Sequence, residues 1–375
     1  MNEPRDVDFD RMSCPLPLTD YDHVLLGHGS GGKLTADLIQ RVFLPELGNL
    51  ILDALEDQAI VPFGATLGGA AQGSAANSAA TNGHPAPRLA FTTDSFVVRP
   101  LFFPGGDIGR LAVHGTVNDL AVGGAIPLYL SAAFILEEGL PMNDLRRIVT
   151  SLAEACREAN VQLVTGDTKV VDHGKGDQIF ITTSGIGIVP AGRRLSIRKA
   201  RPGDRVIVSG TIGDHGIAIM SLREGIEFET VLESDSAALH DLTRVMLDAC
   251  PEIRCMRDPT RGGVSSALNE LAAASNVGVH IHEPKLPVRA EVSAACEMLG
   301  LDPLYVANEG KLIAVVPAEH AERVLSVMRQ HPLGRNSALI GEIVQDHPGM
   351  VIMRSVIGGD RVVTMLAGEQ LPRIC

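Results

Sequence analysis

The chain contains 375 residues, of which 45% are hydrophobic, so it is long enough for two or three domains with packed cores. Its net charge of -13, the absence of Trp and the presence of three Tyr argue against a nucleic-acid-binding surface that stacks on bases. No stretch approaches the ~18 uninterrupted apolar residues of a membrane span, and residues 1–10 lack the features of a signal peptide, so we expect a cytoplasmic globular protein that binds neither nucleic acid nor membrane.

Two polar segments near the start of the chain show no periodicity. Residues 1–22 are predicted to form a flexible arm, so order is expected to begin at His23. Residues 64–87 are rich in Gly, Ala, Ser and Asn and bury too little apolar surface to offset the entropy cost of ordering. We interpret residues 64–87 as a disordered insertion.

A glycine-rich motif, Gly27 to Lys33, precedes a segment, 34–55, that we expect to be helical. The motif fits a dinucleotide-binding turn, but no second strand follows to deliver a ribose-binding carboxylate. It also fits a phosphate-binding loop, except that Leu34 replaces the hydroxyl residue that would bind Mg²⁺. Because glycines let backbone N–H groups converge on an anion, the sequence favours a phosphate-contacting loop over a purely structural turn. The predicted contacts are Gly29, Ser30, Gly31, Gly32 and Lys33.

From residue 89 onward, strands and helices are predicted in two series separated by a basic, turn-rich segment at 190–202. The segments are too closely spaced for regular βαβ winding, so we predict a mixed α/β (α+β) protein with domains at 23–190 and 191–366. The predicted strands are 89–93, 127–136, 161–165, 178–189, 205–208, 277–282, 312–316 and 338–344, and the predicted helices are 107–122, 142–160, 236–249, 263–275 and 318–329.

Four acidic residues lie at predicted strand ends or on an apolar helix. Asp94 and Asp167 each follow a predicted strand, and Asp258 opens a helix of the second series. Asp119, with Asn118 beside it, lies on an apolar-faced helix, where a carboxylate needs a partner or a metal. Each acid alone is also explained as a helix cap or turn residue. Together, hard oxygen ligands without His or Cys partners suit Mg²⁺ bound to a polyphosphate.

The chain ends on Cys375, and no secondary-structure periodicity precedes it from residue 367 onward. We predict that residues 367–375 form a mobile tail, because chain ends are usually exposed and mobile. Fully extended, such a tail spans roughly 30 Å and reaches an active site on its own or a neighbouring subunit. The alternative is a frayed terminus that happens to end in Cys. The other five cysteines form no CxxC pair and are interpreted as small apolar residues.

The order of these motifs resembles the HypE family of hydrogenase expression/formation proteins, within the ATP-dependent superfamily of aminoimidazole ribonucleotide synthetase and selenophosphate synthetase. The runs that carry the resemblance are HGSGGK, FTTDS, VNDLAVGGAIP, VTGDTKVV, DPTRGG, NEGKL and the terminal PRIC. The resemblance covers residues 25–375 apart from 64–87. It implies a two-domain aminoimidazole ribonucleotide synthetase-like fold and a homodimer whose N-terminal domains pair into a β-barrel, with ATP bound near that interface.

The resemblance also implies an activity, the ATP-dependent dehydration of a carbamoyl group on the Cys375 thiol to a thiocyanate. This product supplies the cyanide ligands of the iron in nickel–iron hydrogenase during its maturation. The implied partners are a carbamoyltransferase maturation protein, which loads the thiol, and an iron-binding hydrogenase maturation scaffold complex, which accepts the cyanide.

The same resemblance, added to the motifs, suggests a role for each candidate residue. Lys169 is expected near the thiocarbamate. Glu309, just before an apolar strand, is the candidate base, and its alternative is a solvated turn acid. The expected Mg²⁺ ligands are Asp94, Asp119 and Asp258 with Asn118 alongside, and the expected nucleotide contacts are the glycine-rich residues together with Gly166, Asp167 and Thr168.

Two alternatives stay open. Selenophosphate synthetase usually carries a Cys or selenocysteine in the glycine-rich segment, where His28 and Ser30 stand here, and it would leave the terminal Cys unexplained. A non-catalytic, ATP-gated carrier protein would use the tail only for docking on partners and would release no ADP.

Overall fold

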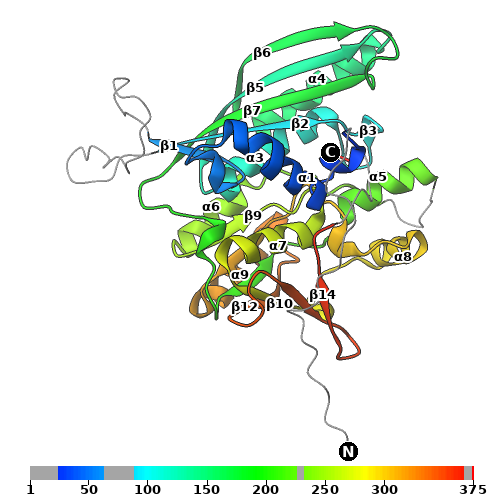
Figure 1. Cartoon of the computed structure of the whole chain (residues 1–375). Coiled ribbons are helices and arrows are strands. Elements are labelled where there is room, and N and C mark those ends of the chain that lie inside the picture. Colours follow the sequence, from blue (N-terminus) through cyan, green and yellow to red (C-terminus); the bar gives the residue numbers. More distant parts are fainter. Residues whose placement is uncertain (1–23, 63–87, 226–231, 367–373) are drawn as a thin grey trace, which may run out of the picture.

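The computed structural model describes residues 24–62, 88–225, 232–366 and 374–375. The predicted arm at 1–22, the insertion at 64–87 and most of the predicted tail, at 367–373, lie outside the described residues. The described chain forms two sheet-based halves, which confirms the prediction of a mixed α/β protein with two domains (Figure 1). No helix within the described ranges is long and apolar enough to cross a membrane.

The first half is built on a five-stranded sheet in the order β1-β2-β7-β5-β6, in which only the pair β5·β6 is parallel. Helix α3 packs on this sheet and α4 packs on α3, and a two-stranded hairpin, β3·β4, precedes α3. The bounds are β1 Ala59–Pro62, β2 Arg88–Phe96, β3 Phe102–Phe103, β4 Gly106–Asp107, α3 Ile108–Val122, β5 Ile126–Glu137, α4 Met142–Glu158, β6 Gln162–Val171 and β7 Ile179–Val189.

The opposite face of this sheet carries exposed apolar side chains. Along strands β2, β5 and β7 buried and more exposed side chains alternate, so that one face of the sheet packs on α3 while the other faces outward. The outward face presents Phe91, Tyr129, Ile135, Ile186 and Ile188, all of which are exposed in the single chain. An exposed apolar patch of this kind is typical of an interaction surface.

The second half is built on a seven-stranded sheet in the order β14-β13-β10-β12-β8-β11-β9. Its core has two layers, because Val206 and Val208 of β8 pack with α7, while Ile207 between them packs with α6 and α9. The bounds are β8 Arg205–Val208, α5 Asp214–Glu224, α6 His240–Ala249, β9 Cys255–Arg257, α7 Gly263–Ser275, β10 Gly278–His282, α8 Ala290–Leu299, β11 Ile313–Val316, α9 Ala321–Gln330, β12 Ala338–Val344, β13 Val351–Arg354 and β14 Asp360–Val363.

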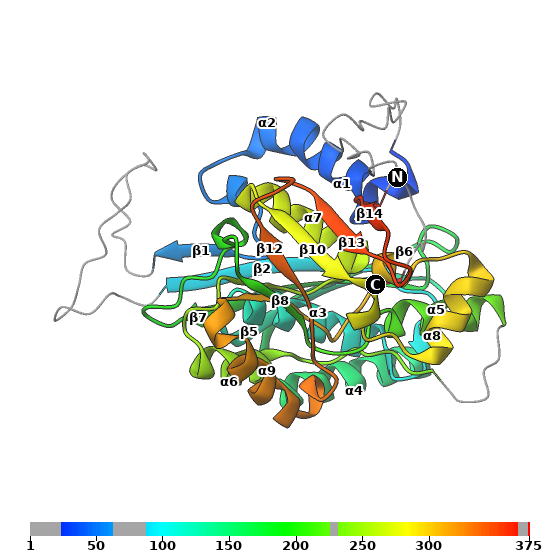
Figure 2. The same cartoon turned by 90° about the horizontal axis from the view of Figure 1, so that it is seen from below.

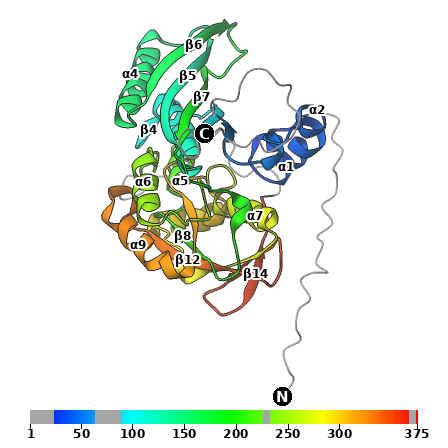
Figure 3. The ribbon, with the colours of Figure 1, turned by 90° about the vertical axis from the view of Figure 1, so that its left-hand side faces the viewer.

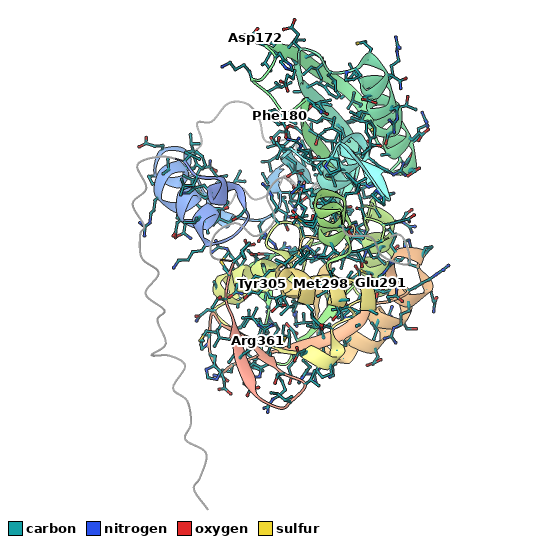
Figure 4. All side chains as sticks on the ribbon, turned by 90° about the vertical axis from the view of Figure 1, so that its right-hand side faces the viewer. Asp172, Phe180, Glu291, Met298, Tyr305 and Arg361 are labelled. Atoms are coloured by element: carbon teal, nitrogen blue, oxygen red, sulfur yellow. The ribbon has the colours of Figure 1, made fainter. Side chains whose placement is uncertain are left out.

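The two sheets lie at opposite ends of the molecule, with α3, α5 and α6 between them (Figure 1). Figure 4 shows Asp172 and Phe180 on the outer part of the first sheet, far from Tyr305, Met298 and Arg361 in the second half. The terminal Cys375 lies between the halves, near β3 and α5 (Figure 1).

The segment after the glycine-rich motif differs from its prediction. Instead of one helix over 34–55, the chain forms α1 (Lys33–Leu38), a π-helical turn (Ile39–Phe43), α2 (Leu44–Leu47) and a short 3₁₀ turn (Leu52–Ala54). The π-helical turn, Pro45 and Gly48 interrupt the regular hydrogen-bond ladder. These helices lie beside α7 and the first sheet (Figures 2 and 3).

Two predicted strand ends are also wrong. Strand β2 continues to Phe96, so Asp94 lies within the strand, opposite Thr183 of β7. Strand β6 continues to Val171, so Asp167 lies within it opposite Ala133. Both extensions follow from pairing with a neighbouring strand, which satisfies backbone groups irrespective of side-chain polarity.

Candidate functional site

A polar cleft between the two halves brings together three of the predicted acidic residues. Asp94 enters from β2, Asp119 from α3 and Asp258 from the loop between β9 and α7, and the predicted glycine Gly31 lines the same cleft. A fourth carboxylate, Asp57, comes from the segment before β1. Residues that are distant in sequence therefore form one acidic cluster, which we call the carboxylate cluster: Asp57, Asp94, Asp119 and Asp258.

Threonine hydroxyls orient two members of the carboxylate cluster. The Thr92 hydroxyl lies 2.7 Å from Asp119 Oδ2, and the Thr116 hydroxyl donates to Asp94 Oδ2 over 3.2 Å. Thr116 is fully buried beside Thr183, whose hydroxyl donates to a backbone carbonyl of α3. This network fixes the carboxylates by packing as well as by hydrogen bonds, which favours a preorganised site.

Burial disfavours the ionised form of every carboxylate in the cluster. It raises the pKa of Asp258 to about 8 and that of Asp57 to about 6, and the pKa values of Asp94 and Asp119 are also raised, with burial the largest cause in each case. Mutual repulsion adds to the effect at Asp119, Asp258 and Asp57. A divalent cation would remove both penalties, and oxygen ligands are those that Mg²⁺ prefers, so the residues fit such an ion.

Two arginines flank the carboxylate cluster. Arg257 Nη2 lies 2.9 Å from Asp57 Oδ1 and 2.5 Å from Glu270 Oε2, while its Nε and Nη1 have no hydrogen-bond partner among the described residues. Arg261 donates to the Gly29 carbonyl over 3.1 Å, and its pKa is raised by the neighbouring Cys375 and, to a smaller extent, by Asp94. Guanidinium groups with free donors beside a cation site are suited to phosphate oxygens.

Asn118 does not point its amide into the cleft. Its Nδ2 donates to the carbonyls of Ala237 (3.0 Å) and Glu309 (3.3 Å), and its Oδ1 accepts from Leu239 N–H (2.7 Å). The side chain is buried and ties α3 to the second half of the chain. The predicted metal-ligand role of Asn118 stays a prediction, and in the described structure its amide is bound by backbone groups.

The glycine-rich motif is packed against the C-terminal part of the chain. Gly31 has a φ of +73°, and a Cβ there would come within 2.7 Å of the Arg261 Cβ. A Cβ on Gly32 would lie 2.2 Å from the Leu366 carbonyl, which accepts from Lys33 N–H. Glycine is therefore required at positions 31 and 32 for this close packing, and Gly31 lines the cleft.

The terminal residues are buried, contrary to the expectation of an exposed tail end. Ile374 and Cys375 belong to an apolar cluster with Phe96, Phe103 and Ile108. A main-chain carboxylate oxygen of Cys375 accepts from Val97 N–H over 3.1 Å. Burial of the Ile374 side chain lowers the free energy of the folded state. This explains why a chain end without regular secondary structure is held in place.

The thiol of Cys375 lies beside Glu309 and Arg261. It forms a hydrogen bond with the Glu309 carboxyl group, and burial, opposed by Arg261, raises the thiol pKa to about 12. Glu309 is buried, its Oε1 has no hydrogen-bond partner within the described chain, and burial raises its pKa well above the usual value. A carboxyl group with a raised pKa, one free oxygen and a neighbouring sulfur is suited to proton transfer.

The remaining predicted residues lie elsewhere. Gly166, Asp167, Thr168 and Lys169 are exposed on β6, the edge strand of the first sheet, where Lys169 Nζ lies 3.0 Å from an Asp167 carboxyl oxygen. They do not line the cleft of the carboxylate cluster within one chain.

Sequence reasoning missed several residues of the site. Arg257 and Arg261 stand in the run that contains Asp258, but only the acid was selected from it. Asp57 carried no motif, although the adjacent pair Glu56-Asp57 just before an apolar run was a usable signal. His114, which lies one turn before Asn118, is buried against Ser236, and burial lowers its pKa to about 3, so it is a core histidine.

Two family models match the chain. The model of the AIR synthase related protein, N-terminal domain, matches residues 75–189, and that of the AIR synthase related protein, C-terminal domain, matches residues 201–353. The matches fall on the first and second halves of the fold.

Relatives of known name match nearly the whole chain. Carbamoyl dehydratase HypE of Azotobacter vinelandii is 57% identical over 348 residues, covering 93% of this chain and 96% of the relative. A solved structure of hydrogenase maturation protein HypE in complex with ATP is 46% identical, with a TM-score of 0.74 over 94% of this chain and 100% of that one. A HypE–HypF complex matches with 46% identity and a TM-score of 0.78 over 88% of this chain and 99% of that one.

Proposed function

Because this chain belongs to the carbamoyl dehydratase HypE family of hydrogenase expression/formation proteins, we propose that it removes water from a carbamoyl group on Cys375. The reaction consumes ATP and leaves a thiocyanate, which supplies cyanide for the iron of nickel–iron hydrogenase. The observation that carries this proposal is the position of the terminal cysteine, held beside Glu309 and Arg261.

The cleft provides the binding groups that such a reaction needs. Asp94, Asp119 and Asp258 would hold Mg²⁺, with Asp57 adjoining, since these carboxylates converge and are poorly ionised on their own. Arg257 and the glycine-rich edge would contact the phosphates. When bound, ATP supplies a phosphoryl group to the carbamoyl oxygen. That oxygen is a poor leaving group by itself but departs readily as phosphate.

Protein groups would do the proton transfer and charge stabilisation. Forming a nitrile requires that both amide protons leave, and the free Oε1 of Glu309 is the candidate acceptor beside the thiol. Arg261, next to both groups, would stabilise negative charge that develops on the oxygen as it is phosphorylated. Burial excludes water, which would otherwise hydrolyse the activated group.

Lys169 fits this proposal in a homodimer. Its strand is the edge of the first sheet, and the outward apolar face of that sheet is exposed in one chain. Pairing of two such sheets into a barrel would cover the apolar patch and join the edge strands. We propose that Lys169, with Gly166, Asp167 and Thr168, then contributes to the site of the partner subunit.

The partners follow from the same chemistry. A carbamoyltransferase must load the thiol, and the solved HypE–HypF complex supports a stable protein partner for members of this family. An iron-binding scaffold must accept the cyanide, because free cyanide would be lost to diffusion. The proposed location of these steps is the cytoplasm, where thiols stay reduced.

The test is the mass of the C-terminal peptide after incubation with the carbamoyl donor system and Mg²⁺-ATP. Dehydration removes 18 Da from the carbamoylated peptide, about the mass of one water, and should be accompanied by ADP. If the peptide is carbamoylated but neither loses this mass nor is accompanied by ADP, the result favours the non-catalytic carrier protein. Release of selenophosphate from selenide and ATP would favour the selenophosphate synthetase alternative.

A further inference from the structure

One histidine holds the chain end from the side of the second half. His215, on α5, is fully buried, and its Nε2 lies 2.6 Å from the carbonyl oxygen of Ile374, the residue before the terminal cysteine. From the first half, the Val97 N–H donates to a main-chain carboxylate oxygen of Cys375. The last two residues are therefore bound through their backbones from both sides of the interdomain cleft.

The surroundings of His215 fix its tautomer. A carbonyl oxygen can only accept, so Nε2 carries the hydrogen and donates to Ile374. Nδ1 then accepts from the Ser234 hydroxyl at 2.8 Å, and that hydroxyl oxygen accepts from Ser236 N–H at 3.1 Å. Burial lowers the pKa of His215, which keeps the imidazole neutral in this arrangement.

The ring cannot easily turn away from the tail. The edge of Phe103 packs against it, with ring centroids 5.6 Å apart and an interplanar angle of 86°. Phe103 also belongs to the apolar cluster that contains Ile374 and Cys375. The histidine is thus held by Ser234 and by the ring of Phe103, and its Nε2–H donates to the carbonyl of Ile374.

We propose that His215 is a positioning residue that latches the terminal dipeptide so that the Cys375 sulfur lies at Glu309 and Arg261. The latch itself is independent of the carbamoyl chemistry, and only its effect on dehydration rests on the proposed function. Apolar contacts of Ile374 alone would hold the tail without fixing the direction of the thiol. The directional hydrogen bond through the neighbouring carbonyl supplies that direction.

Asn and Gln variants separate the two ring nitrogens. In His215→Gln the amide nitrogen reaches about as far as Nε2 and can still donate to Ile374. In His215→Asn the shorter amide keeps the place of Nδ1, beside Ser234, and leaves the Ile374 carbonyl without a donor. The matched control is His280→Asn on β10, which removes a histidine from the second half outside the contacts of the tail.

The first measurement is the rate at which iodoacetamide labels Cys375 in the full-length protein, read from the mass of the C-terminal peptide. A buried thiol is labelled only when the tail opens, so loss of one buried hydrogen bond should raise the rate about tenfold in His215→Asn. His215→Gln and His280→Asn should label at the wild-type rate. Equal labelling of His215→Asn and wild type would overturn the latch.

The second measurement is single-turnover dehydration of carbamoylated protein. His215→Asn should be carbamoylated normally, because loading takes place with the tail released, yet convert to the thiocyanate about tenfold more slowly. Rescue by His215→Gln identifies the donor at Nε2 as the cause, whereas equal loss in both variants refutes a directional role. If labelling behaves as expected but the wild type itself forms no thiocyanate, the proposed function fails and the latch stands.

Discussion

Replacing Asp258 by Asn should stabilise the metal-free protein while it removes the response to Mg²⁺. Burial and the neighbouring Asp57 raise the pKa of Asp258 to about 8, so ionisation of this group opposes folding. Asn has nearly the same shape and no charge. A carboxylate kept at a cost to stability is expected at a site that binds a cation.

The sign and size of the effect follow from linkage. In the unfolded chain Asp258 loses its proton near pH 4, whereas in the folded chain it keeps that proton up to about pH 8. The folded state therefore binds about one more proton between these values, and stability falls as pH rises through this window. The advantage of Asn over Asp should grow by about 1.4 kcal/mol per pH unit, or roughly 2 to 3 kcal/mol from pH 6 to 8.

Thermal unfolding with EDTA at pH 6, 7 and 8 measures this advantage. The midpoint of Asp258→Asn should exceed that of the wild type by a margin that widens by roughly 2.5 to 4 °C over the series, given the unfolding entropy of a chain of 375 residues. Comparing the variant with the wild type at each pH cancels the contribution of the buried histidines, whose pKa values burial lowers. Asp172→Asn, at an exposed carboxylate, is the control. A margin that stays constant with pH would refute the reasoning, as would an equal gain from Mg²⁺ in both proteins.

The other predictions concern the reaction and the dimer. Cys375→Ala should abolish peptide modification without loss of Mg²⁺-ATP binding by calorimetry; any thiocyanate formed by this variant would contradict the central proposal. Glu309→Gln should carbamoylate normally but dehydrate at least 100-fold more slowly in single turnover, since it lacks the proton acceptor. Lys169→Ala and Cys375→Ala should each be inactive alone, yet mixed dimers should recover up to about a quarter of wild-type turnover if Lys169 acts across the dimer, and no recovery would place it in its own subunit's site. Ile186→Asp should produce monomers in sedimentation velocity, because it charges the outward apolar face.

Much of the element pattern could be predicted from the sequence because it depends on local periodicity. Helix α3 begins and ends within one residue of its prediction, and β12 and α7 match theirs. Helices α5 and α8 were not predicted. Helix α5 is buried on most of its sides, so it lacks a one-sided apolar spacing. Helix α8 does have such a spacing, at Val292, Ala295, Cys296 and Leu299, and that signal was missed. Both are packed against each other and against neighbouring loops, so their burial depends on tertiary structure.

The site could be predicted only in part because its geometry is tertiary. Asp94, Asp119 and Asp258 were found as acids in unusual local surroundings, and the fold brings them together. Asn118 has equally suggestive neighbours in sequence, but its amide is consumed by backbone groups that approach from 119 and more residues away. No local sequence pattern predicts such a contact. A polar residue on an apolar helix therefore indicates a buried partner, but the sequence does not show whether that partner is a metal ion or a backbone group.

The buried thiol also constrains the order of events. A thiol attacks as its thiolate, and with its pKa raised to about 12 the tucked Cys375 is protonated at neutral pH. The apolar cluster around Ile374 also makes the thiol inaccessible to a partner protein. Under the proposed function, loading of the carbamoyl group therefore requires Cys375 to leave this buried position for water, in which the thiol has its ordinary pKa. Once carbamoylated, the sulfur no longer needs to ionise, so the burial that suppresses loading does not hinder dehydration. The same pocket thus separates the two proposed steps. It prevents carbamoylation of the thiol, whereas it favours dehydration because it excludes water and places Glu309 beside the sulfur.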